Sequence, residues 1–333
     1  MKLRGAVVGC GMISEFHLRA WRRIPEVEIV ALVDPETGRA KQSRDAFYPA
    51  AEVFSDMMTM LQCSCIDFVD ILTPPWVHRE QCLQAAKRNL HIICQKPLCD
   101  RWDEADSLVQ ELRNYRQLFC VHENHPFRPW FRRVLKQKEE GFFGDLHEVQ
   151  LWQRDVTEPP EKFKTQGERG ILLDYGIHLV AMAQTLLGKP DSVGAHLEKI
   201  NPRVRAESRA QLTFSYPEAK AEVEVAWQDG GEFSGGFTLQ GSQGACVYTG
   251  TLARGNESRF CLFHEGEEVE NEVRSPTADY AESFFLFQRD FVDALISGSC
   301  PPQPVSDNLQ ILKTVFEAYE SATDVRTTPT SHS

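Results

Sequence analysis

The sequence predicts an α/β protein of two domains, a helix-covered parallel sheet in residues 1–122 and a second α/β domain in residues 123–333. In the first third of the chain, short apolar runs alternate with helix patterns, as is typical of a parallel sheet with helices on both faces. After about residue 123, longer stretches alternate polar and apolar residues, which indicates an antiparallel sheet with one buried face. A chain of 333 residues is long enough for two ordinary domains.

Five short apolar runs of the first domain are suited to buried parallel strands. Between the last two runs, residues 100–114 carry Ala105, Leu108 and Leu112 at helical spacing, which predicts an amphipathic helix. The five runs are RGAVVG at 4–9, VEIVALVD at 27–34, IDFVDILT at 66–73, LHIIC at 90–94 and LFCVH at 118–122.

The second domain begins with a helical pattern over residues 126–144 that ends at a glycine. The clearest strand is AKAEVEVAW at 219–227, in which Ala221 and Val223 would face one way and Glu222 the other. Near the end of the chain, residues 306–322 repeat apolar side chains at helical spacing, which predicts a closing helix.

Composition and charge exclude several classes of protein. With 42% hydrophobic and 25% charged residues the chain has the composition of a globular protein, and its net charge of -12 argues against nucleic acid and anionic membranes as partners. No apolar segment is long enough for a membrane span, and the N-terminus lacks the pattern of a secretory signal. The ten cysteines include no C-x-x-C pair, so we expect reduced thiols and a cytoplasmic location.

A glycine-rich turn, VVGCGMIS, follows the first apolar run. Gly9 and Gly11 match the first two glycines of the dinucleotide fingerprint G-x-G-x-x-G, and Ser14 stands in the third position, where a small residue is tolerable. Asp34 ends the next run, 34 − 11 = 23 positions after Gly11, where an acidic side chain would accept hydrogen bonds from the adenosine ribose. NAD is therefore favoured. NADP stays open because Arg39, Lys41 and Arg44 follow, although these basic residues also fit a solvated helix face.

Two further motifs follow later strands, at the sheet edge where ligands bind in open α/β proteins. TPPWVH runs from Thr73 to His78, with prolines that end the strand and start a helix. CQKPL places Lys96 between Gln95 and Pro97. A lysine at this position is either part of a binding or catalytic site or a loop lysine with a buried stem, and the residues alone do not choose between the two.

In the second domain, GILLDYGIHL sets Asp174 and His178 four residues apart in an apolar run. At helical spacing these two polar groups would share one face. Such a pair is an ordinary buried hydrogen bond, part of a metal site, or a pair that handles protons in catalysis.

Together these motifs resemble the glucose-fructose oxidoreductase/inositol dehydrogenase family (Gfo/Idh/MocA), over nearly the whole chain. The resemblance implies a Rossmann NAD-binding domain and a C-terminal α/β domain whose open, mostly antiparallel sheet covers the nicotinamide and commonly forms an oligomer interface. A homodimer or homotetramer is therefore expected. It also implies that Lys96, Asp174 and His178 are catalytic and meet at the substrate carbon. The expected cofactor contacts are Gly9, Gly11, Met12, Ile13, Asp34, Thr73, Pro74, His78, Gln95 and Lys96.

The same resemblance suggests a sugar, polyol or sugar derivative as the substrate. Two departures stand out: Gln95 replaces the usual glutamate, and Pro126 stands where many relatives carry an arginine. A metal is not expected, because His122, Glu123 and His125 would point in alternating directions if the strand continued. The expected substrate contacts are Asn124, Trp152, Arg169, Asp174 and His178, of which Trp152 and Arg169 fit a sheet face or a loop equally well.

Three functions stay open at this point. The first is a dehydrogenase or reductase in which His178 accepts a hydroxyl proton and Lys96 stabilises the oxygen. The second is a redox-neutral enzyme, such as an epimerase or a glycoside-cleaving enzyme, in which bound NAD oxidises the sugar only transiently. The third is a non-catalytic NAD-binding sensor.

Overall fold

The computed structural model describes residues 2–156, 169–252, 255 and 257–322. The chain forms two compact units, one made of residues 1–127 and 281–312 and the other of residues 128–280 and 313–333. These units differ from the consecutive segments expected from the sequence, because residues 281–312 return to pack with the first unit. Whether residues 1–122 and 123–333 act as separate domains stays a prediction.

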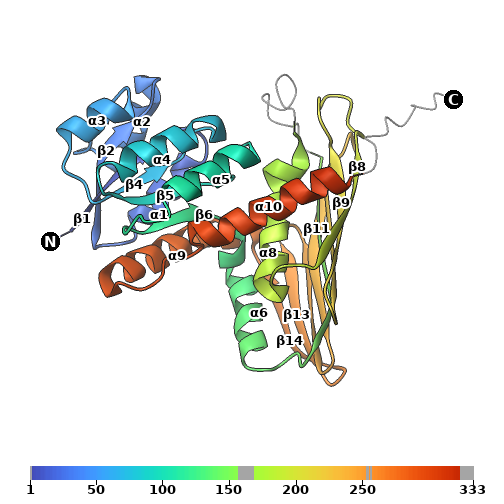
Figure 1. Cartoon of the computed structure of the whole chain (residues 1–333). Coiled ribbons are helices and arrows are strands. Elements are labelled where there is room, and N and C mark those ends of the chain that lie inside the picture. The colour runs from blue at the N-terminus through green and yellow to red at the C-terminus, as the bar shows by residue number, and fades with distance from the viewer. Residues whose placement is uncertain (1, 157–168, 253–254, 256, 323–333) are drawn as a thin grey trace. The chain divides into compact units, whose positions relative to one another are not determined.

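Six described strands of the first unit form a fully parallel sheet in the order β3-β2-β1-β4-β5-β6 (Figure 1). The order reverses beside β1, so β1 and β4 flank the crevice where open parallel sheets bind ligands. The strands are β1 (Leu3–Val8), β2 (Val27–Val33), β3 (Glu52–Phe54), β4 (Phe68–Ile71), β5 (His91–Gln95) and β6 (Phe119–His122). The helices are α1 (Ser14–Trp21), α2 (Thr37–Phe47), α3 (Met57–Cys63), α4 (His78–Ala86) and α5 (Trp102–Glu111), with short 3-10 turns at Pro75–Val77 and His125–Phe127.

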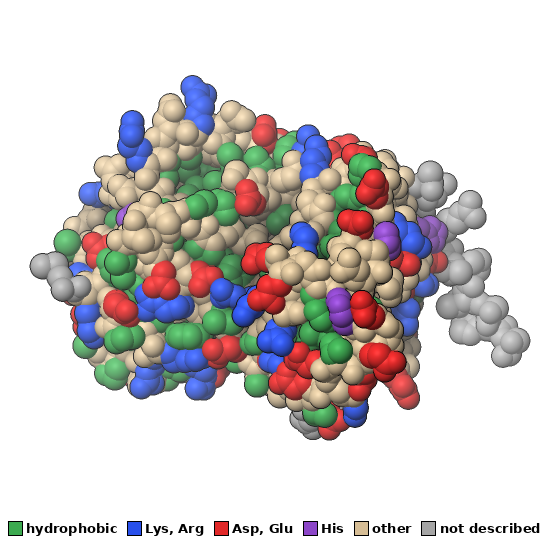
Figure 2. Space-filling view, turned by 90° about the horizontal axis from the view of Figure 1, so that it is seen from below, with side chains coloured by type: hydrophobic (Ala, Val, Ile, Leu, Met, Phe, Trp, Pro, Cys, Tyr) green, Lys and Arg blue, Asp and Glu red, His purple; other side chains and the backbone are tan. Residues whose placement is uncertain are grey.

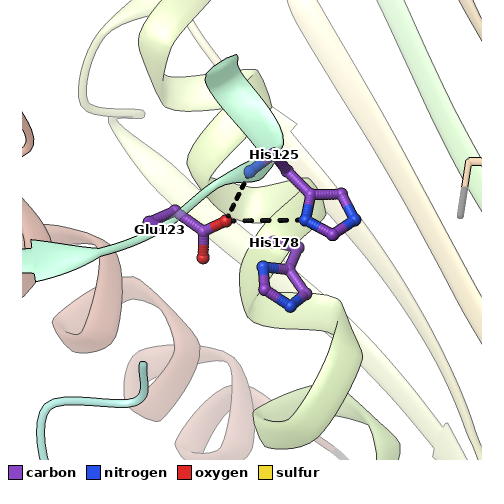
Figure 3. A group of neighbouring side chains, drawn as sticks. All are labelled: Glu123, His125 and His178. Atoms are coloured by element: carbon purple, nitrogen blue, oxygen red, sulfur yellow. Dashed lines mark hydrogen bonds and ion pairs between the residues drawn. The ribbon is translucent and has the colours of Figure 1, made fainter. Parts of the chain in front are cut away.

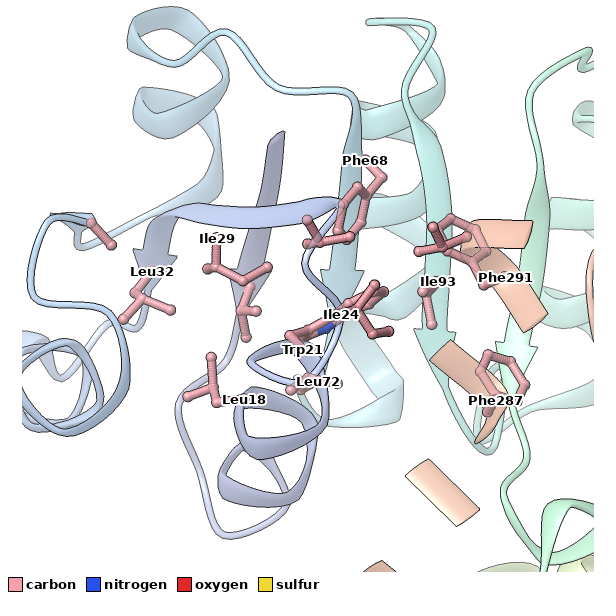
Figure 4. Close-up of a cluster of buried hydrophobic side chains, with 14 of the residues drawn as sticks. Leu18, Trp21, Ile24, Ile29, Leu32, Phe68, Leu72, Ile93, Phe287 and Phe291 are labelled. Carbon is pink, nitrogen blue, oxygen red and sulfur yellow. The ribbon is translucent and has the colours of Figure 1, made fainter. Parts of the chain in front are cut away.

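The core of the first unit includes side chains from both ends of the chain (Figure 4). Trp21 on α1 packs against Phe68 on β4, with ring centroids 4.9 Å apart. Phe291, on α9 (Pro276–Ser297), packs against Phe68 at 5.7 Å. Helix α9, which follows the second sheet in the sequence, therefore completes the core that the first part of the chain begins.

The second unit contains an eight-stranded sheet in the order β14-β13-β12-β11-β7-β10-β9-β8 among the described residues. Among the described strands of this sheet, only β7 and β10 pair in parallel, and every other pair of neighbours is antiparallel. The predicted fold class, a Rossmann-like parallel sheet plus a mostly antiparallel second sheet, is confirmed. The strands are β7 (Leu146–Asp155), β8 (Ser192–Glu198), β9 (Arg209–Ser215), β10 (Lys220–Trp227), β11 (Ser234–Gly241), β12 (Gly244–Gly250), β13 (Ser258–His264) and β14 (Glu267–Arg274).

Helices of the second unit cover one face of this sheet (Figure 1). Trp130 on α6 (Pro129–Glu139) stacks on Tyr248 of β12 at 4.3 Å, and α8 (Ile177–Leu187) packs on β7 and β10. As predicted, Ala221 and Val223 of β10 are buried and Glu222 is exposed. No described helix covers the other face of the sheet, which is called the open face below, and α10 (Val305–Ser321) closes the described chain.

Both acidic and basic side chains lie on the face shown in Figure 2. They are interspersed with hydrophobic and uncharged polar groups, and no continuous field of Lys and Arg covers the described part of this face. Among the described helices, none is both long enough and apolar enough to cross a bilayer.

Candidate functional site

The glycine-rich turn after β1 has the backbone that its two glycines predict. Gly9 has φ +101°, and a Cβ there would lie 2.8 Å from the backbone carbon of Leu72. Around the Cβ position of Gly11, in contrast, no described residue beyond its two chain neighbours has an atom within 4 Å. Gly9 thus permits close packing of β1 on the chain after β4, and Gly11 leaves room for a ligand to approach the backbone.

Ser14 takes the place of the third glycine without opening the turn. Its side chain is 2% exposed, and its Oγ donates a hydrogen bond to the Gly11 carbonyl at 2.6 Å. Ile13, at the N-cap of α1, makes no capping hydrogen bond through its side chain. The first N–H groups of α1 therefore have no side-chain cap, as is suitable for binding a pyrophosphate.

Asp34 lies just after β2 and binds the backbone of the same turn. Its Oδ2 accepts from Cys10 N at 2.9 Å, and its Oδ1 accepts from Glu36 N at 2.8 Å. Burial, reinforced by the Asp34 charge, raises the pKa of Cys10 to about 12, so this thiol stays protonated. Each Asp34 oxygen keeps a second lone pair, so a ribose contact stays a prediction.

Two of the three basic residues that leave NADP open are ion-paired. Arg39 lies 2.9 Å from Glu36, and Arg44 lies 2.8 Å from Asp45. These exposed pairs fit the solvated helix face that was the alternative interpretation.

His78 joins the two turns that follow β4 and β5. Its Nε2 lies 2.7 Å from the Thr73 carbonyl, and its Nδ1 lies 3.0 Å from the Pro97 carbonyl and 3.2 Å from that of Leu98. The side chain is fully buried, and this burial lowers the pKa of His78. Any effect of His78 on a cofactor would therefore act through the shape of these turns. Pro74, in the first turn, is exposed.

Lys96 directly follows β5 at the carboxyl edge of the parallel sheet. Gln95, which is 8% exposed, accepts a hydrogen bond from Lys96 N at 2.8 Å through its Oε1. The Lys96–Pro97 peptide bond is cis, a feature that the sequence did not reveal. Lys96 thus lies at the sheet edge that the sequence predicts. The hydrogen bond from its backbone N–H to the Gln95 side chain holds the turn after β5.

The chain turns at the end of β6 instead of continuing as a strand. Glu123 Oε1 accepts a hydrogen bond from His125 N at 3.0 Å and lies 3.7 Å from His125 Nδ1 (Figure 3). Asn124 is 3% exposed, and its Nδ2 donates to Ser283 Oγ at 2.8 Å. The alternating side-chain directions expected for residues 122–125 therefore do not occur, because β6 ends at His122.

In the second unit, Asp174 and His178 lie on consecutive turns of one helical segment. Asp174 belongs to a π-helical stretch, Leu172–Gly176, which runs directly into α8. His178 is in the first turn of α8 (Figure 3), is 6% exposed, and has the Tyr175 ring edge-on at 5.5 Å. The sequence predicted a helix here but not its π-helical turn, a feature often found at functional sites.

Glu207 holds the start of this segment, and no sequence motif marks that role. Its Oε1 accepts from Gly170 N at 2.8 Å, from Leu172 N at 3.2 Å and from Tyr319 Oη at 2.6 Å. Burial raises the pKa of Glu207, and burial together with the Glu207 charge raises that of Tyr319. Glu207 and Tyr319 thus position the segment that carries Asp174.

The structure does not bring Trp152 together with Asp174 and His178. Alternate residues of β7 face opposite sides of the sheet, and α8 packs on the side of the buried Leu151, so Trp152 belongs to the open face. Arg169 stacks its guanidinium on Phe316 at 4.5 Å and on Tyr319 at 4.4 Å. Trp152 thus lies on a sheet face, which was one of its alternative interpretations, and Arg169 packs on two aromatic rings. Substrate binding by either residue stays a prediction.

The first unit therefore fits a dinucleotide. It combines a glycine turn open at Gly11, an uncapped helix start, and the carboxylate of Asp34 at the end of the second strand. Lys96 belongs to this unit, whereas Asp174 and His178 belong to the second.

A parallel sheet with this turn at its switch point defines a dinucleotide-binding protein. Residues 3–123 match the oxidoreductase family with an NAD-binding Rossmann fold, and residues 131–247 match the GFO/IDH/MocA C-terminal domain. The chain belongs to this Gfo/Idh/MocA family of oxidoreductases, as its motifs suggested.

Named relatives resemble it over most or part of its length. A D-apiose dehydrogenase from Paraburkholderia graminis is 28% identical, covering 98% of this chain and 89% of the relative. A myo-inositol 2-dehydrogenase from Thermotoga maritima is 24% identical over 56% of this chain and 55% of the relative. The crystal structure of an oxidoreductase from Agrobacterium radiobacter, in complex with NAD+, L-tartaric acid and magnesium, has a TM-score of 0.85 at 25% identity and covers 97% of this chain and 96% of its own.

Proposed function

We propose that this protein is an NAD-dependent dehydrogenase that transfers a hydride between the nicotinamide and a hydroxyl-bearing carbon of a sugar or polyol. The family supports NAD-linked redox chemistry, and relatives named for D-apiose and myo-inositol support a polyhydroxylated substrate. The observation that carries the proposal is the position of Lys96, at the carboxyl edge of the sheet whose glycine turn fits the dinucleotide.

His178 and Lys96 would handle the proton, with Asp174 beside them, and bound NAD would supply the hydride acceptor. A neutral His178 accepts the hydroxyl proton at a ring nitrogen. Lys96 donates a hydrogen bond to the same oxygen and stabilises its negative charge. Asp174 orients His178 or holds another substrate hydroxyl. The proposal requires that the two units bring Lys96 to the Asp174 and His178 segment.

We also propose that the protein is cytoplasmic and that it associates with copies of itself. All ten cysteines are free thiols, which supports a reducing compartment such as the cytoplasm. The uncovered face of the eight-stranded sheet supports self-association. NAD is the proposed cofactor, with NADP as the outcome to test against it.

The first experiment determines what the purified protein holds. It is denatured, the supernatant is assayed for NAD and NADH, and the native protein is then screened with sugars and polyols at the nicotinamide absorbance. Reduction of added NAD by one sugar supports the dehydrogenase and names its substrate class. If the protein copurifies with cofactor and turns substrate over without a net change in nicotinamide absorbance, the redox-neutral function is favoured instead.

Replacing the proposed proton-handling residues separates catalysis from mere NAD binding. We expect Lys96→Met and His178→Ala each to lower kcat by about 100-fold or more, because each removes a group acting on the reacting oxygen. His178→Ala should still bind NAD, as measured by the rise in its melting temperature when NAD is added. The matched controls are Lys87→Met and His147→Ala, both at exposed positions. Intact turnover in both test variants would refute the proposed roles of Lys96 and His178, whereas a wild-type protein that binds NAD and turns over no substrate would favour the sensor.

A further inference from the structure

A buried polar network links α1 to the residue before Lys96, entirely within the first unit. His17 and Asp70 are both 0% exposed, and His17 Nδ1 lies 2.8 Å from Asp70 Oδ2. The same oxygen accepts a hydrogen bond from Trp21 Nε1 at 2.8 Å. Gln95 Nε2 lies 3.0 Å from His17 Nε2, and Gln95 Oε1 accepts from Lys96 N at 2.8 Å.

The direction of each hydrogen bond follows from its neighbours. The backbone N–H of Lys96 only donates, so the Gln95 carbonyl oxygen must face it and the Gln95 amide group must face His17. Because that amide group only donates, His17 Nε2 must accept. The ring proton is then on Nδ1, where it is donated to the Asp70 carboxylate.

We infer that His17 and Asp70 are positioning residues that act through Gln95 to hold the backbone of Lys96. The inference rests on the proposed function, in which Lys96 contacts the reacting oxygen. Gln95 and a neutral His17 form a matched pair: a glutamate at this position would have no proton to donate to His17 Nε2. Its carboxylate would therefore face a lone pair unless the imidazole took up a second proton.

The surroundings of His17 leave few other partners for it. His122 on β6 has its ring centroid 4.2 Å away, and Phe284 on α9 lies edge-on at 5.2 Å. Gln288 Nε2, also on α9, is 3.4 Å from the His17 carbonyl and 3.4 Å from Nδ1. With Trp21 donating to Asp70, the groups of the neighbouring elements that titrate near His17 are Asp70 and His122.

The tautomer of His17 is the first test, and it needs no substrate. Nitrogen-15 NMR of the histidine rings in the full-length protein should show His17 neutral, protonated on Nδ1 and unprotonated on Nε2, with its signals assigned by their absence in His17→Gln. A proton on Nε2 in the wild-type protein would overturn the inference. This outcome does not depend on whether any sugar is oxidised, so it is distinct from a failure of the proposed function.

The second test is Gln95→Glu, with Gln110→Glu as the matched control on the exposed face of α5. We expect at least about tenfold faster hydrogen exchange at the Lys96 amide and an about tenfold lower kcat, with a smaller change in the KM for NAD. A Gln95→Glu protein that behaves like Gln110→Glu in hydrogen exchange, kcat and KM would contradict the inference.

Discussion

At the residue scale, buried polar side chains hold the proposed site in shape. His78 joins two turns, Asp34 binds the glycine turn, and Glu207 accepts three hydrogen bonds on one carboxylate oxygen. Buried polar groups with partners contribute modestly to stability, whereas removing one partner leaves the others unsatisfied at a larger cost. The loss of stability caused by a substitution at these positions should therefore depend strongly on whether the new side chain keeps the hydrogen bonds.

Glu207 allows this dependence to be measured. Glu207→Gln keeps an oxygen for the three donors and should retain stability, whereas Glu207→Ala leaves them unpaired and should lose about 2–4 kcal/mol of unfolding free energy. Urea unfolding of both variants checks this prediction. Equal losses in the two variants would show that the three hydrogen bonds are not what stabilises the segment.

The same residue predicts a pH dependence. Burial raises the pKa of Glu207 in the folded protein above its usual 4.5, so its stabilising contribution is full below about pH 4.5 and is lost as pH rises through the folded pKa. The amide in Glu207→Gln is uncharged like the protonated acid, so this variant should keep the stabilising contribution as pH rises. The unfolding free energy of Glu207→Gln minus that of wild type should therefore increase as pH rises above 4.5. A difference independent of pH would contradict the raised pKa.

Sequence motifs located the candidate site better than they located its supports. Lys96 and the Asp174 and His178 pair were identified because each stands in a short, recognisable motif. Glu207 and Tyr319 were missed because their partners are distant in sequence: Glu207 binds Gly170 across 37 residues, and Tyr319 binds Glu207 across 112. A buried acid and a solvated one look alike in a sequence, and only tertiary packing distinguishes them.

At the scale of elements, the helical segment from Ile171 to Leu187 depends on a close approach at its start. A Cβ on Gly170 would lie 1.9 Å from the Glu207 carbonyl oxygen, which is backbone and cannot rotate away. The residue before the segment must therefore be glycine.

Gly170→Ala should accordingly lower the unfolding free energy by about 3 kcal/mol or more, because the start of the segment must shift. The matched control is Gly38→Ala in α2, where a Cβ meets no atom within 4 Å and alanine should stabilise by about 0.5–1 kcal/mol. Thermal unfolding measures both variants. If Gly170→Ala were as stable as Gly38→Ala, the segment would not depend on this approach.

The regular elements were predictable where hydrophobic patterns are strong. The five apolar runs of the first unit became β1, β2, β4, β5 and β6, and the alternation in residues 219–227 became β10. The edge strand β3 has only three residues, none of them fully buried, and its pattern is too short to read. The turn at Leu172–Gly176 differs from an α-helix in hydrogen bonding and not in apolar spacing, so periodicity did not reveal it.

At the scale of the whole molecule, the open face of the eight-stranded sheet is where we expect the proposed self-association to occur. A hollow of about 760 Å³ on this face is lined by residues of β7, β8, β9 and β10. Opposite charges are interspersed there: Glu224 pairs with Arg154 at 2.7 Å and with Arg209 at 3.1 Å. A surface with both charges can complement a second copy of itself.

Reversing one charge on this face should weaken the proposed assembly. We expect Glu222→Lys to shift a dimer or tetramer toward monomer. The substitution replaces the negative charge beside Lys220 with a positive one, which would repel Lys220 of the same copy and of the second copy. Light scattering coupled to size-exclusion chromatography measures the mass. Glu267→Lys, on the exposed strand β14, is the control. A wild-type protein that is monomeric would refute self-association, and an unchanged oligomer in Glu222→Lys would place the interface elsewhere.

The return of residues 281–312 to the first unit has a consequence for how the protein is made. Phe287, Phe291 and Val292 belong to the same buried cluster as Trp21 and Phe68. A ribosome releases these groups far apart in time, so part of the apolar surface of the nascent first sheet stays uncovered until residues 287–292 have emerged. Completion of the nucleotide-binding unit is thereby tied to translation of α9, and a message cut short after the second sheet would yield a chain whose first core lacks these side chains.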